Sequence, residues 1–116
     1  MTINQRIIQA LTPLGLPVAP DTDTESQERC FVFSADQTST FYCDDAPLLY
    51  SFKVQVYLIL PAEENGVALL DRAVRAMAEA GFSRPEVVDA ADENGQRKVL
   101  ECETQAIEEE GTYRWL

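Results

Sequence analysis

The chain has 116 residues, 46% of them hydrophobic, which is the size of one domain with a single core. Its 20 acidic and 9 basic residues give a net charge of −11, which argues against a general nucleic-acid binder and against docking onto anionic membrane. It has no histidine, so the commonest general base and the commonest zinc ligand are both absent.

The three cysteines, Cys30, Cys43 and Cys102, show no CxxC spacing. Without a histidine to activate them, we expect buried, inert thiols in a reducing cytoplasm. The first residues lack the basic and apolar regions of a signal peptide, and the longest apolar stretch contains Ser51, Lys53 and Gln55, which excludes a membrane span.

The first expected element is a helix over residues 2–12. Thr2 followed by Gln5 three residues later has the pattern of a capping box, and Pro13 and Gly15 end the helix. The helical period predicts that four polar residues point mostly outward: Asn4, Gln5, Arg6 and Gln9. Residues 16–20 (LPVAP) are expected to be extended, and residues 21–28 (DTDTESQE) to form an acidic loop.

Aromatic and β-branched residues predict two short strands, 29–34 and 38–43, joined by a turn at 35–37 as a hairpin. The sequence Asp44-Asp45-Ala46-Pro47 then breaks the pattern.

Residues 48–60 predict a long strand with one buried face. Every even position is apolar: Leu48, Tyr50, Phe52, Val54, Val56, Leu58 and Leu60. Such a strand exceeds the usual length of about 5–6 residues. We therefore expect its end to project beyond the core and to meet a neighbouring subunit, with Leu49 and Tyr57 as apolar residues on its second face.

Residues 66–80 predict a second helix, capped by Asn65 and ended by Gly81 and Phe82. Its apolar stripe is expected to contain Val67, Leu70, Val74 and Met77. Residues 86–91 and 97–108 predict a second hairpin around the turn at 92–95, with Leu100, Cys102, Thr104 and Ala106 on one face. The order α-β-β-β-α-β-β predicts a single α+β domain over 1–116, a two-layer sandwich whose mainly antiparallel sheet is covered on one face by two helices.

No motif for catalysis, a cofactor or a metal is present, and we expect the protein not to be an enzyme. The carboxylate pairs Asp44-Asp45, Glu63-Glu64 and Asp92-Glu93 each lie beside a predicted break, which is typical of turn residues. At the C-terminal end, Tyr113, Arg114 and Trp115 are residue types that dominate protein interfaces, although Trp115 could equally fold back onto its own domain.

Residues 1–108 resemble the tail terminator, or tail-completion, family of siphophages and prophages. The shared features are the Asp-Asp-Ala-Pro-Leu break, the strand YSFKVQVYLIL, the helix end AMAEAGF and the hairpin EVVDAADENGQRKVLECETQ. The resemblance implies a structural, non-enzymatic protein of the virion, made in the host cytoplasm, that forms a ring, typically a hexamer. Its implied partners are its own copies, the tail tube protein and the head-completion or connector protein, without a membrane, a cofactor or stably bound nucleic acid.

The residues expected at such an interface are Asp44, Asp45, Pro47, Leu49, Tyr57, Tyr113, Arg114 and Trp115. The acidic composition agrees with a ring through which DNA passes without binding, because a cationic wall would hold the phosphates. The alternative is a small acidic cytoplasmic adaptor or inhibitor that binds one protein partner through a sheet edge or through Trp115. A ring and a monomer or dimer differ in mass, so the mass in solution distinguishes the two functions.

Overall fold

The computed structural model describes residues 1–20, 29–41, 49–61, 63–89 and 96–116. Within them the chain forms two α-helices, α1 (Ile3–Leu11) and α2 (Val67–Glu79), a short 3-10 helix η1 (Thr12–Leu14) and one six-stranded sheet. The strands are β1 (Val18–Pro20), β2 (Cys30–Phe41), β3 (Leu49–Leu60), β4 (Glu86–Asp89), β5 (Gln96–Glu109) and β6 (Thr112–Trp115). The protein therefore belongs to the α+β class, as the sequence predicts.

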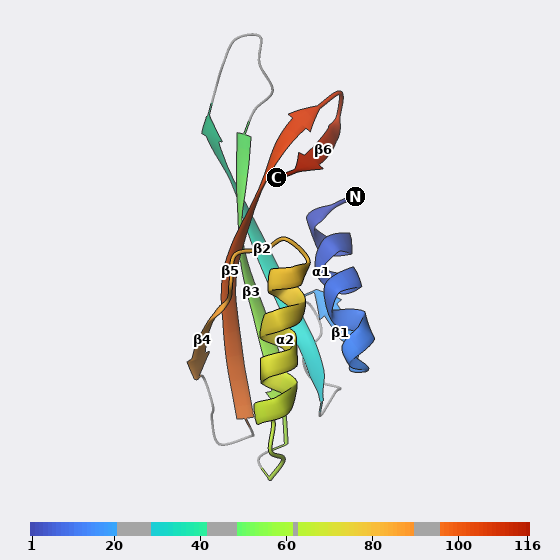
Figure 1. The fold of residues 1–116 in the computed structure, drawn as a ribbon, viewed down its shortest axis with the longest axis vertical. Coiled ribbons are helices and arrows are strands. Elements are labelled where there is room, and N and C mark those ends of the chain that lie inside the picture. Colours follow the sequence, from blue (N-terminus) through green and yellow to red (C-terminus); the bar gives the residue numbers. More distant parts are fainter. Residues whose placement is uncertain (21–28, 42–48, 62, 90–95) are drawn as a thin grey trace.

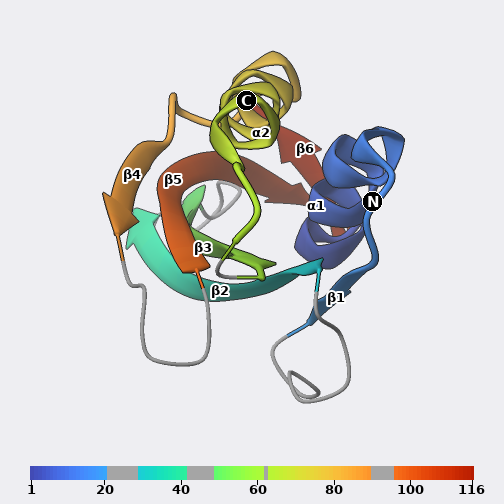
Figure 2. The ribbon, with the colours of Figure 1, turned by 90° about the horizontal axis from the view of Figure 1, so that it is seen from below.

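The sheet has the order β1-β2-β3-β5-β4, and β6 pairs with the far end of β5. Only β1 and β2 run parallel, so the sheet is mainly antiparallel. Figure 2 shows that the sheet curls like half of a barrel and that both helices lie on its concave side. This curvature, which the sequence does not predict, follows from the right-handed twist that accumulates along strands of 12 to 14 residues.

The molecule is elongated, with extents of 54 × 25 × 21 Å. At one end, here called the tip, the ends of β2, β3 and β5 continue past the helices together with β6 (Figure 1). At the other end, here called the base, lie the start of β2, the end of β3 and the start of β5 (Figure 1). The helices pack against the sheet between the base and the middle of the molecule.

The predicted turn at 35–37 is wrong, because β2 is one continuous strand. It pairs with β3 from Cys30 opposite Ile59 to Phe41 opposite Leu49, with an irregularity only between Ser39 and Phe41. Ala-Asp-Gln offers no glycine or asparagine for a tight turn, and continued pairing places Ala35 opposite Val54 on the concave face. The first hairpin is therefore β2–β3, and its connection falls outside the described residues.

The predicted alternation of the long strand is confirmed along β3, where Phe52, Val54, Val56, Leu58 and Leu60 are buried on the concave face. The predicted face of β5 is also buried, with Leu100, Cys102, Thr104 and Ala106 opposite the β3 core positions. The core is completed by apolar residues of the other elements, chiefly Ile7, Leu11, Phe31, Phe33, Ala73, Val74, Met77 and Phe82.

Helix α2 confirms its predicted end and corrects its predicted start. Its first residue, Val67, is 72% exposed instead of lying in the apolar stripe, because it precedes the part of the helix that faces the sheet. The Asn65 side chain accepts a hydrogen bond from the Val67 amide (3.1 Å), although Gly66 is the capping residue. At the other end Gly81 has φ +99° and, with Phe82, donates to Ala78 and Met77, which is the Schellman arrangement.

A hairpin between β5 and β6 lies where the sequence predicts no strand. Glu110 and Gly111 both have positive φ (51° and 82°), which suits a two-residue turn that closes on Glu109 and Thr112. Between β4 and β6 the edge of β5 is covered by single residues: Ser83 donates its amide to the Glu103 carbonyl, and Leu116 donates to the Gln105 carbonyl. As a result β5 has partners on both sides along most of its length.

Candidate interaction surfaces

The structure separates the interface residues predicted from sequence. Leu49 and Arg114 lie in one row on the convex face at the tip, since each is opposite Ile107 of β5. Tyr57 lies on the same face near the base, eight residues along β3 from Leu49. Tyr113 and Trp115 point to the concave face instead. Asp44, Asp45 and Pro47 lie outside the described residues, as do Cys43 and the carboxylates at 92–93.

Tyr113 and Trp115 form an aromatic cluster with two residues of β3. Trp115 packs 5.2 Å from Phe52, and Tyr113 meets Tyr50 and Phe52 edge-on at 5.6 and 5.5 Å. The indole nitrogen of Trp115 also donates to the Met1 carbonyl (3.1 Å). Of the two sequence-based readings of Trp115, the structure therefore has the residue packed on its own domain, while Arg114 stays exposed beside Glu109 at 3.2 Å.

Arg6 is the main residue that the sequence places wrongly. It was expected to point outward, yet it is only 9% exposed and points onto the sheet. Its guanidinium donates to Thr104 Oγ1 (2.9 Å) and to the Ala80 carbonyl (2.7 Å), and lies 4.6 Å from the Phe82 ring centre and 4.4 Å from that of Trp115. Burial lowers the pKa of Arg6, because desolvation disfavours the charged form.

Arg6 thus joins four segments that are distant in the sequence: α1, the end of α2, β5 and the C-terminal strand. No single stretch of sequence could reveal this role, since the two hydrogen-bonded partners lie 98 and 74 residues away. The contacts stabilise the aromatic cluster from the helix side, combining charge-assisted hydrogen bonds with cation–π attraction.

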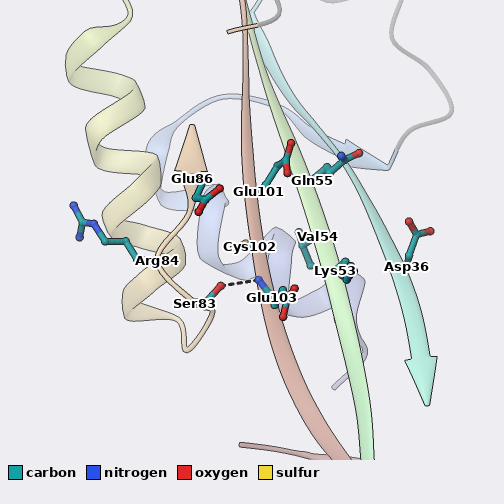
Figure 3. Close-up of a pocket in the computed structure, with 10 residues that line it drawn as sticks. All are labelled: Asp36, Lys53, Val54, Gln55, Ser83, Arg84, Glu86, Glu101, Cys102 and Glu103. Carbon is teal, nitrogen blue, oxygen red and sulfur yellow. Dashed lines mark hydrogen bonds between the residues drawn. The ribbon is translucent and has the colours of Figure 1, made fainter. Parts of the chain in front are cut away.

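The middle of the convex face holds a polar hollow of about 520 Å³. Its carboxylates come from β2, the start of β4 and β5, namely Asp36, Glu86, Glu101 and Glu103, and Lys53 lies in register between Asp36 and Glu103. Figure 3 shows that Arg84 points away from this group. None of these five residues forms an ion pair with another residue of the described chain, so the hollow is a surface of net negative charge.

The convex face is more apolar near the base than in its middle. Near the base, one row across four strands contains Val32, Tyr57, Val99 and Val88. Val32 and Val99 are buried, and Val88 is exposed. Tyr57 is therefore a predicted interface residue that is partly exposed and lies in an apolar row.

A groove of about 710 Å³ lies between α2 and β4, on the concave side. Val67, Leu70, Val74, Pro85 and Val87 supply its apolar lining. Val67 and Val87 are both exposed, and β4 has no strand on its outer side among the described residues. This groove had no signal in the sequence, where Val67 was expected in the core.

The buried thiols are poor nucleophiles. Cys30 and Cys102 are 3% and 5% exposed, and burial raises the pKa of Cys30 and raises that of Cys102 to about 11. Among the described residues no group of histidine, cysteine and carboxylate side chains is arranged to hold a metal ion. In the same part of the chain no helix is long and apolar enough to cross a membrane.

The chain matches no known protein-family model, and no curated protein matches it in sequence.

Proposed function

We propose that this protein is the subunit of a ring, typically hexameric, that caps the tail tube of a siphophage or prophage and joins the tail to the head connector. The observation that carries the proposal is the tip: two hairpins, β2–β3 and β5–β6, extend from one end of a 54 Å long molecule (Figure 1). A projecting sheet end of this kind is suited to contacts with neighbouring subunits and with a tube, more than to an enclosed active site.

The charge of the protein supports the same function. DNA that moves through a tail must not be held by the wall around it. The carboxylates of the convex hollow and the net charge of −11 repel phosphates, and 9 basic residues against 20 acidic ones leave little counterion release to favour binding. The sheet and its two helices form a layered frame, and we propose that this frame sits in the head-proximal end of the virion tail as a structural, non-enzymatic element.

The direct test uses a siphophage tail tube protein. Tubes assembled in its presence should carry one ring at one end, visible by negative-stain electron microscopy, and should stop growing there. Tubes that grow to unchanged length without an added ring would contradict the proposal. Sedimentation across a salt series supplies a second measurement: self-association should strengthen with salt, because each copy brings a net charge of −11 and salt screens the repulsion.

The groove between α2 and β4 favours the alternative of an adaptor that binds one protein partner. It offers apolar contacts through Val67 and Val87 next to the outer edge of β4, which carries no further strand among the described residues. An adaptor would stay monomeric or dimeric with tubes present and would form a complex of fixed small mass with its partner. Light scattering on the chain with and without tubes separates the two functions.

A further inference from the structure

One edge of the sheet at the tip is open along β2. β1 covers β2 only opposite Phe31–Phe33, and no described strand pairs with that side from Ser34 to Phe41. The open edge contains one charged residue, Asp36, and neither lysine nor proline. Sheet edges of this length usually carry several charged residues, especially lysine, or proline, which prevent another strand from pairing with the free N–H and C=O groups.

The outward groups of this edge can be assigned. The Phe31 amide donates to Pro17 on the β1 side (2.8 Å), so odd residues of β2 direct their backbone groups away from β3. By alternation, Ala35, Gln37 and Ser39 present their N–H and C=O groups on the open side. These odd positions also have their side chains on the concave face, since Ala35 is opposite the buried Val54.

The second open edge at the tip is β6, on the far side of the same four strands. The Leu116 amide donates to Gln105 of β5 (3.0 Å), so even residues of this strand face β5, and Tyr113 and Trp115 present their backbone groups outward. No described residue forms a backbone hydrogen bond with them on that side. β6 runs in the opposite direction to β2, and the two edges lie on opposite sides of the tip (Figure 1).

In this pairing, side chains of the two edges would share the same face of the sheet, and two opposite charges would lie next to each other. If Tyr113 and Trp115 of one copy pair with Gln37 and Ala35 of another, all four side chains lie on the concave face. Arg114 then lies opposite Asp36 on the convex face. Asp36 has no ion pair with a described residue, and among the described residues Arg114 forms an ion pair only with the exposed Glu109.

We propose that β6 of one copy adds antiparallel to the open edge of β2 in a second copy, with Arg114 opposite Asp36. The contact is heterologous, so each copy keeps one open edge for the next and the series closes by rotation. If the two copies lay at the same height along the strands, the pairing would differ from this one by four residues. The proposed register therefore shifts one copy by about 13 Å along the strands relative to its neighbour. A closed sheet needs such a stagger, because its strands tilt against the axis. That the series closes into a ring rests on the proposed function.

The first test is a charge swap measured by sedimentation velocity. D36R raises the net charge by two and R114D lowers it by two. A general effect of net charge would therefore move the two variants in opposite directions. The cross-strand pair predicts that each variant weakens association about fivefold and that the double variant D36R/R114D recovers it, because cross-strand pairs contribute up to about 1 kcal/mol.

The matched control is the exposed pair on α2, Asp71 and Arg75, which are 3.2 Å apart and far from both edges. D71R and R75D carry the same charge changes and should leave association at the level set by net charge alone. If D36R and R114D behave like these controls, the proposal is wrong.

The second test is a disulfide cross-link between copies. Residues 36 and 114 would form a non-hydrogen-bonded pair, with Cα atoms about 4.5 Å apart, which is within disulfide range. The double variant D36C/R114C should give a ladder of covalent multimers on mild oxidation, whereas D71C/R114C and the unmodified chain should not.

The outcomes separate this inference from the proposed function. Rings that cap tubes without a 36–114 cross-link would overturn the inference and leave the function intact. Cross-linked chains that never cap a tube would support the edge pairing and overturn the function. A chain that stays monomeric at every concentration and salt would overturn the edge pairing.

Discussion

The base and the tip of this molecule are stabilised in different ways. Toward the base, aliphatic side chains of the sheet pack against α2 and α1, in a core that contains Val56, Leu58 and Met77. Toward the tip, β6 of the same chain supplies Tyr113 and Trp115 as cover for Phe52, and α1 contributes only through Arg6, which stacks on Trp115 (Figure 1). One end therefore has a core of helices against the concave side of a curled sheet, and the other is a sheet end that depends on the C-terminal strand and whose outer edges carry no further strand among the described residues.

The largest effect is expected from a charge placed where the two regions meet. Val54 is 1% exposed in the centre of β3, so V54D buries an unpaired carboxylate and should destabilise the fold by about 4 kcal/mol or more, enough to unfold it. Circular dichroism checks this. K53D is the matched control, because the neighbouring side chain is exposed on the convex face, and it should remain folded. A folded V54D protein would refute the register of β3.

A smaller loss is expected at the contact that joins the two regions. R6M keeps most of the side-chain bulk but removes both hydrogen bonds and the cation–π contacts, and leaves the Ala80 carbonyl and Thr104 hydroxyl unpaired. We expect about 2–3 kcal/mol of destabilisation in urea unfolding. Hydrogen exchange should show the tip losing protection before the base. Q9M on the exposed side of α1 should change neither measurement, and equal losses at both ends would argue against Arg6 as the link.

Gly81 provides a weaker test of the same junction. Its φ of +99° disfavours any side chain, and a Cβ there would lie 2.9 Å from Arg6 Nη2. We expect G81A to cost about 1–2 kcal/mol by thermal unfolding. Because Arg6 can shift once it is shortened, G81A should cost less in an R6M background. Fully additive effects would show that the two residues act independently.

Removal of metal ions is expected to have no effect on stability. The described residues offer no metal site in either region, so chelator treatment should leave the melting temperature unchanged. A melting temperature that falls with chelator and recovers with one added metal would contradict this expectation.

The parts of the fold that follow from local pattern could be predicted from sequence. Alternation along β3 and β5, the capping box of Thr2 and Gln5, and the helix end at Gly81 each depend on neighbours within a few residues, and all are observed. The short turn expected at 35–37 failed because strand continuity is decided by pairing with β3, which a local reading does not include.

The candidate interface was less predictable for the same reason. Residue type singled out Tyr113, Arg114 and Trp115 as candidate interface residues, but only the β5–β6 pairing shows that alternate residues face opposite sides of the sheet. Arg6, the groove at Val67 and the open edge at Asp36 arise from contacts between distant segments. Their individual residues carry no distinguishing signal in the sequence.

The pairing of β3 with β5 has a mechanical consequence. Their ladder is unbroken from Leu49 opposite Ile107 at the tip to Leu60 opposite Gln96 at the base. A force that pulls β3 and β5 in opposite directions along the long axis loads these hydrogen bonds in shear, so many must break at once instead of opening one after another. A subunit built in this way resists axial tension better than tension applied across its strands, and its orientation in an assembly would decide how much strain it withstands.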